Sequence, residues 1–102
     1  MKLSEVLTAL RRWLAGVELP AQVQRDSDDS LWVIFESGNA LAELIAGDGS
    51  YAPYRFVSFT VLDTRRDTMA EPVYCFYDDE SHTIDDILRE LDRGMTIAQI
   101  QV

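Results

Sequence analysis

The chain has 102 residues and a formal net charge of −9, from 18 acidic and 9 basic side chains. Its length supports a single domain, and a hydrophobic fraction of 47% with 26% charged residues is typical of a globular chain rather than a disordered one. No basic cluster exceeds two residues, which disfavours binding to nucleic acids and to anionic lipid. No apolar run reaches the roughly 18 residues that a membrane span requires, and we expect a cytoplasmic protein.

The first segment is predicted to form an amphipathic helix. Ser4 has the side chain of a helix N-cap, and Gly16 is the expected end of the helix. Its apolar residues recur with helical spacing: Val6, Leu7, Leu10, Trp13 and Leu14. After Pro20, residues 21–25 read as a strand, 26–30 as a polar turn and 31–36 as a strong strand rich in β-branched and aromatic residues.

Residues 40–46 allow two interpretations. As a strand, they complete a hairpin around Gly38 and Asn39. As a helix, they are capped by Asn39 and end at Gly47, with Leu41 and its apolar neighbours on one face. We favour the strand, because a helix of seven residues is marginal. Further strands are predicted at 54–62 and 73–77, with a polar loop over 63–71.

The last element is predicted to be a helix over 83–93. Thr83 and Asp86 have the spacing of a capping box, and Gly94 is the expected stop. The tail, 95–102, is then a short strand or turn that packs back. The predicted class is α+β, with a mainly antiparallel four- to five-stranded sheet flanked by N-terminal and C-terminal helices in the order α-β-β-β-β-β-α.

The predicted strands carry apolar residues on both faces. In strand 31–36, Leu31, Val33 and Phe35 alternate with Trp32 and Ile34. Two short helices cover about one face of such a sheet, so the other face is either an interaction surface or is covered by sheet twist, the 63–71 loop and the tail.

The acidic segment 78–86 is the only dense group of polar residues. Oxygen-rich clusters suit Ca²⁺ or Mg²⁺, but the segment lacks the spacing of an EF-hand loop. It reads more readily as a strand-to-helix connection that could dock a basic partner. The only histidine is His82, and the only cysteine, Cys75, lies in an apolar strand, so no catalytic residue, metal ligand or cofactor motif is assigned. Glu36 and Glu43 are expected to face water or to pair with Arg55.

These observations favour a non-enzymatic protein-binding domain. One version is an acidic immunity or antitoxin-type protein that neutralises a basic protein partner. The candidate contact residues combine tyrosines and acids: Tyr54, Tyr74, Tyr77, Asp78, Asp79 and Glu80. The alternatives are a secretion-chaperone-like homodimer that binds a client segment and a small metal-dependent enzyme that uses the 78–86 cluster.

Overall fold

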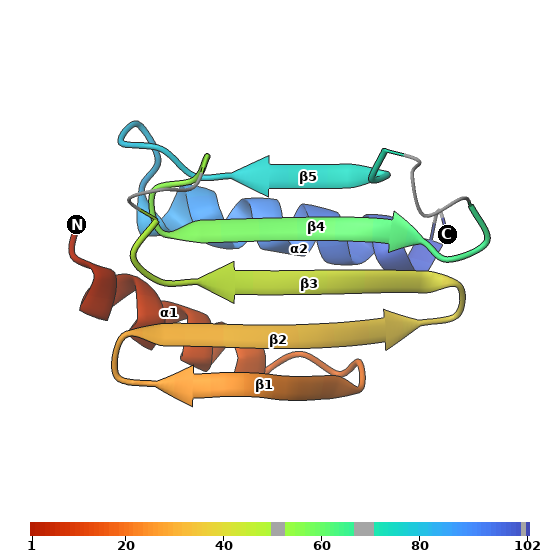
Figure 1. The fold of residues 1–102 in the computed structure, drawn as a ribbon, viewed down its shortest axis with the longest axis horizontal. Helices are drawn as coiled ribbons and strands as arrows, with labels where there is room; N and C mark the ends of the chain where they lie inside the picture. The colour runs from red at the N-terminus through yellow and green to blue at the C-terminus, as the bar shows by residue number, and fades with distance from the viewer. Residues whose placement is uncertain (50–52, 67–70, 101) are drawn as a thin grey trace.

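The computed structural model describes residues 1–49, 53–66, 71–100 and 102. The chain forms a helix, five strands and a second helix, which confirms the predicted α+β class. In chain order the elements are α1 (Leu3–Ala15), β1 (Ala21–Ser27), β2 (Ser30–Ser37), β3 (Ala40–Ala46), β4 (Val57–Asp63), β5 (Tyr74–Tyr77) and α2 (Ile84–Ile100). The strands form one antiparallel sheet in sequential order, β1-β2-β3-β4-β5 (Figure 1).

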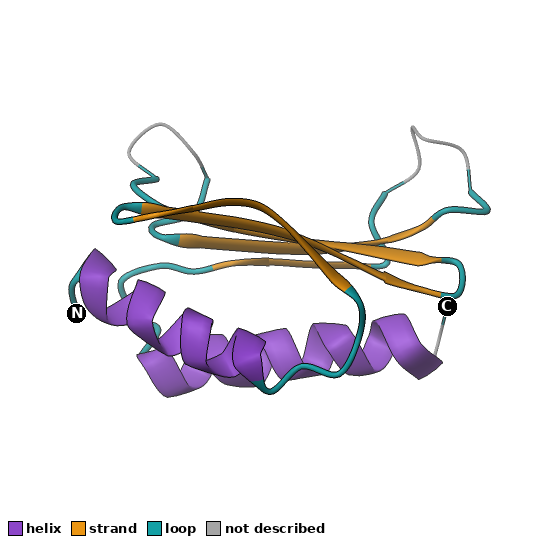
Figure 2. Ribbon diagram, turned by 90° about the horizontal axis from the view of Figure 1, so that it is seen from below, coloured by secondary structure: helices purple, strands orange, loops and turns teal. Residues whose placement is uncertain are grey.

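Both helices lie on the same face of the sheet, so the molecule has two layers (Figure 2). The hydrophobic core fills the space between them, because one apolar stripe of each helix faces the alternate buried side chains of β2, β3 and β4. Phe35 and Phe59 are its largest members and pack edge to face with each other and with Trp13 of α1. The opposite face of the sheet carries no helix in the described part of the chain.

Residues 40–46 form a strand, the favoured of the two interpretations. Gly38 has φ 57°, and Ser37 pairs with Ala40 across the turn, so Gly38 and Asn39 close the β2–β3 hairpin. The strand is also paired with β4 along its whole length. Hydrogen bonding on both edges therefore places β3 at the centre of the sheet.

Several predicted boundaries of the first helix and the strands are wrong. The turn predicted over 26–30 is shorter, because β1 continues to Ser27 and β2 begins at Ser30. The N-cap of α1 is Lys2, and Ser4 lies inside the first turn, where its carbonyl accepts a hydrogen bond from Thr8 Oγ1 at 2.9 Å. The fourth strand begins at Val57 instead of residue 54, because the chain bends through 54–56. Gly16 is the C-cap of α1, as predicted.

The end of the second helix is also mispredicted. The capping box forms as expected, with Thr83 N donating to Asp86 Oδ2 at 2.9 Å and Asp86 N donating to Thr83 Oγ1 at 3.1 Å. However, α2 continues through Gly94 to Ile100, so the tail is mostly helical. A Cβ at Gly94 would lie 2.8 Å from Phe59 Cδ2 and 3.0 Å from Tyr74 Cδ1. Gly94 therefore permits close contact between helix and sheet and does not end the helix.

Candidate protein-binding face

The sheet presents one face to solvent, which we call the open face. It consists of the side chains that alternate with the core residues of β2 to β5 and therefore point away from the helices. Its members are Trp32, Ile34, Glu36, Leu41, Glu43, Ile45, Ser58, Thr60, Leu62, Cys75 and Tyr77. Trp32 on β2, Leu62 on β4 and Tyr77 on β5 are large apolar side chains that remain 38%, 39% and 45% exposed on this face.

The two helices, including most of the predicted tail, lie on the other side of the sheet and do not cover this face (Figure 2). Residues 67–70 of the predicted 63–71 loop lie outside the described residues. Within the described chain, the open face therefore exposes contiguous apolar side chains of the kind that mark interaction sites.

A hydrogen bond connects an aromatic and an acidic side chain near the centre of the open face. Trp32 Nε1 donates to Glu43 Oε2 at 2.9 Å. The two residues are diagonal neighbours, because Trp32 pairs with Ile45 and Ile34 pairs with Glu43 in the β2–β3 ladder. The bond fixes the indole and the carboxylate relative to each other on the sheet surface.

Two hollows lie beside this pair. One, of about 180 Å³, is lined by Ile34, Leu41, Glu43, Thr60 and Leu62. The other, of about 250 Å³, is lined by Arg25, Ser30, Leu31, Trp32, Ile45 and Ala46. Glu43 thus borders the first hollow and Trp32 the second, and both hollows are largely apolar.

The acidic residues of the open face are not neutralised within the described chain. No ion pair joins Glu36 or Glu43 to a basic side chain there. Of the two alternatives expected for these acids, contact with water or a pair with Arg55, the pair is not formed in the described chain, and the Arg55 guanidinium carbon lies 4.8 Å from the centre of the Phe56 ring. The face therefore combines apolar surface with unpaired negative charge.

The three candidate tyrosines do not share one face of the sheet. Tyr54 and Tyr77 lie together, with ring centres 6.2 Å apart, and Tyr77 belongs to the open face. Tyr74 packs on the helix side, where its hydroxyl donates to the Glu90 carbonyl oxygen at 3.0 Å and to Glu90 Oε2 at 2.5 Å. Burial, together with Glu90, raises the pKa of Tyr74 above its usual range.

The three candidate acids differ in exposure. Asp78 is 1% exposed, and its Oδ1 accepts hydrogen bonds from the backbone N–H groups of Phe56 and Val57 at 2.7 and 2.8 Å. Asp78 therefore fixes the start of β4. Asp79 and Glu80 are exposed, and hydrogen bonds from Ser81 hold the pKa of Asp79 below its usual value. The fold thus leaves Tyr54, Tyr77, Asp79 and Glu80 accessible.

Sequence reasoning did not single out Trp32 or Glu43 as partner-binding residues. The alternation of strand 31–36 did place Trp32 and Ile34 on a common face. What it lacked was the knowledge that both helices pack on the other face, which is a property of the tertiary structure.

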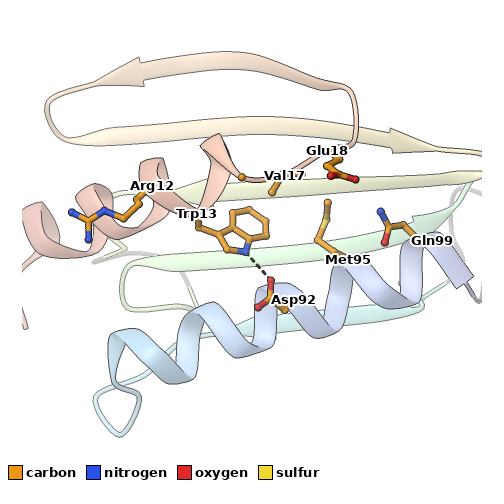
Figure 3. A pocket seen from close by; sticks show the side chains of 8 residues that line it. Arg12, Trp13, Val17, Glu18, Asp92, Met95 and Gln99 are labelled. Atoms are coloured by element: carbon orange, nitrogen blue, oxygen red, sulfur yellow. Dashed lines mark hydrogen bonds between the residues drawn. The ribbon is translucent and has the colours of Figure 1, made fainter.

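A groove of about 480 Å³ lies between the end of α1 and α2 (Figure 3). The Trp13 indole, which lines the groove, already donates to Asp92 Oδ1 at 2.8 Å, and Arg12 points away from that pair. No convergent set of titratable groups forms in the groove. Across the described chain, no group of three His, Cys, Asp or Glu side chains is placed to hold a metal ion.

Neither described helix combines the length and the apolar composition needed to cross a bilayer. Comparisons with protein-family models, with curated proteins and with solved structures gave no match to this chain.

Proposed function

We propose that this chain is a non-enzymatic protein-binding domain that docks a basic protein partner on its open face. The observation that carries the proposal is the exposed apolar surface around Trp32, Leu62 and Tyr77 on the side of the sheet that the helices leave uncovered. Tryptophan and tyrosine are enriched among the residues that contribute most to protein–protein affinity. The Tyr54–Tyr77 pair extends the same surface towards the β5 edge.

The charge of the chain supports a basic partner. A net charge of −9 accelerates the approach of a positively charged protein and repels nucleic acid and anionic membrane. An immunity-type protein that covers and neutralises a basic protein is one form of this function. Association should weaken as ionic strength rises, because salt screens the long-range attraction.

The open face could also take a second copy of the chain, as in a secretion-chaperone-like homodimer. This arrangement would bring together two chains of net charge −9, each with unpaired Glu36 and Glu43 at the contact. Like charges across an interface oppose association, so we favour the basic partner. Light scattering coupled to size-exclusion chromatography distinguishes the two, since a stable dimer would support the homodimer.

Site-specific photocrosslinking tests the proposal. A benzophenone amino acid at Leu62 on the open face is compared with one at Arg89, whose side chain is 68% exposed on α2. In lysates of native cells, we expect Leu62 but not Arg89 to crosslink to one basic protein, with a yield that falls when salt is added before illumination. Equal yields from both positions, or no adduct from Leu62, would overturn the proposal, and an adduct of two copies would establish the homodimer instead.

A further inference from the structure

The hollow beside Glu43 has the features of a receptor for one particular kind of side chain. Glu43 is partly buried between neighbours on both sides: Ile34 pairs with it on β2, and Thr60 pairs with it on β4. Its Oε2 accepts the Trp32 indole N–H, which holds the carboxylate in place at the edge of the hollow. Leu41 and Leu62, which pair with each other, form the apolar end of the same hollow.

A second carboxylate lies close to the apolar end. Glu36 pairs with Leu41 in the β2–β3 ladder and is exposed on the same face. The basic residue of β1 that points to this face, Arg25, lies opposite Trp32 and lines the other hollow. In the part of the chain that the structure describes, Arg25 forms no ion pair with either glutamate.

We propose that this hollow anchors a lysine or arginine side chain of the basic partner, an inference that rests on the proposed function. The aliphatic stem would pack on Ile34, Leu41 and Leu62, as long basic side chains do on apolar surface. The cationic group would pair with Glu43, whose position the Trp32 hydrogen bond has already fixed. Glu36 would add a second negative charge beside the stem.

Other occupants fit the hollow less well. A wholly apolar side chain would desolvate Glu43 without compensating its charge, which is costly. A second copy of the chain would bring two more carboxylates, Glu36 and Glu43, to the contact but only one basic side chain, Arg25. The contact would therefore keep an excess of negative charge. A cationic side chain with an apolar stem matches both the lining and the charge.

A model peptide provides the test. In acetyl-Leu-Gly-Arg-Gly-Leu-amide, an extended backbone directs the two leucines and the arginine to the same side. The control peptide carries citrulline, a neutral analogue of arginine with nearly the same shape. Binding is followed by the methyl NMR signals of Ile34, Leu41 and Leu62 in the labelled, full-length protein. We expect the arginine peptide to shift these signals and to bind about fivefold or more tightly than the citrulline peptide.

Two variants with the same change in net charge separate the anchor from general attraction. Glu43→Gln keeps an oxygen acceptor for the Trp32 indole but removes the local charge, so it should abolish the preference for arginine over citrulline. Glu18 lies on the helix side of the sheet, so the Glu18→Gln variant should still bind the arginine peptide more tightly than the citrulline peptide. The Trp32 indole N–H signal reports whether Glu43→Gln retains the native arrangement.

The outcomes distinguish this inference from the proposed function. The proposed binding of a basic side chain in the hollow would be overturned by equal binding of the two peptides, by equal effects of the two variants, or by the absence of shifts at the open-face methyl groups. A crosslink from Leu62 to a basic protein would leave the proposed function standing in that case. If no crosslink forms from Leu62, the proposed function is overturned, whichever of the two peptides binds more tightly.

Discussion

Replacing Gly94 with alanine should destabilise the protein even though alanine is the better helix former. In an open helix this substitution would stabilise by about 1 kcal/mol. Here the added Cβ would lie 2.8 Å from Phe59 Cδ2 and 3.0 Å from Tyr74 Cδ1, well inside normal contact distance. The Phe59 ring is fully buried and packs edge to face with Trp13, Phe35 and Tyr74, so it has no free space to move into.

The steric cost should therefore exceed the gain in helix propensity. Overpacking a dense core typically costs 1–3 kcal/mol, and contacts this short place the cost near the upper end of that range, at about 2–3 kcal/mol. Subtracting the propensity gain of about 1 kcal/mol leaves an expected net loss of about 1–2 kcal/mol in the free energy of unfolding. For a domain of this size that corresponds to a fall in Tm of roughly 4–8 °C for each kcal/mol. Urea unfolding followed by tryptophan fluorescence and circular dichroism measures the change directly.

Two further variants test the reasoning. Gly16→Ala is the matched control, because a Cβ there meets only Trp13 O at 3.6 Å, and its effect should stay within about 0.5 kcal/mol. In a Phe59→Leu background, Gly94→Ala should cost at least about 1 kcal/mol less than in the native chain, since the shorter side chain leaves room. A Gly94→Ala variant as stable as the native protein would refute the close-contact explanation, as would strict additivity of the two substitutions.

Three other predictions concern single polar groups. Asp78→Ala should lower the free energy of unfolding, measured in urea, by about 2–4 kcal/mol, because two backbone N–H groups at the start of β4 lose their acceptor. Asp78→Asn keeps an oxygen acceptor and should lower it less. Equal losses from the two variants would contradict the role of Asp78 as that acceptor. Tyr74→Phe should cost about 1 kcal/mol through the lost bonds to Glu90. Because the pKa of Tyr74 is raised in the folded state, the stability that its hydroxyl contributes is fully present below about pH 10 and is lost as the pH rises further. The difference in free energy of unfolding between the native and Tyr74→Phe proteins, measured in urea, should therefore narrow above about pH 10. A difference that stays constant with pH would contradict the raised pKa. NMR titration should give Asp63 a pKa of about 2, caused by hydrogen bonds from Arg65, and Arg65→Gln should return it towards 3.8; an unchanged value would exclude Arg65 as the cause.

Local residue chemistry was sufficient to predict most elements of the fold. The helical spacing of residues 6–14, the turn at Gly38 and Asn39, and the capping box at Thr83 and Asp86 each depend on side chains only a few positions apart. The secondary structure of residues 40–46 could not be predicted uniquely, because their apolar spacing suits a strand and a short helix alike. Pairing with β2 and β4 makes the segment a strand, and no local pattern contains that pairing.

The candidate site was only partly predictable. The sequence placed Tyr54, Tyr74, Tyr77 and Asp78 among the contact residues from their type alone. The fold uses Tyr74 to bind α2 and buries Asp78 beneath the start of β4, because each reaches a partner far away in the chain.

The sequence by itself determined the α+β class, the break between elements at Gly38 and Asn39, and the presence of apolar residues on both faces of the central strands. Those features follow from backbone preferences and from the two-residue repeat of a strand, which are local properties. Only the tertiary structure decided that Gly94 continues a helix, that both helices share one face, and that Trp32 and Glu43 meet on the other. These outcomes depend on packing between segments distant in sequence, where space and hydrogen-bond partners are set by the whole fold.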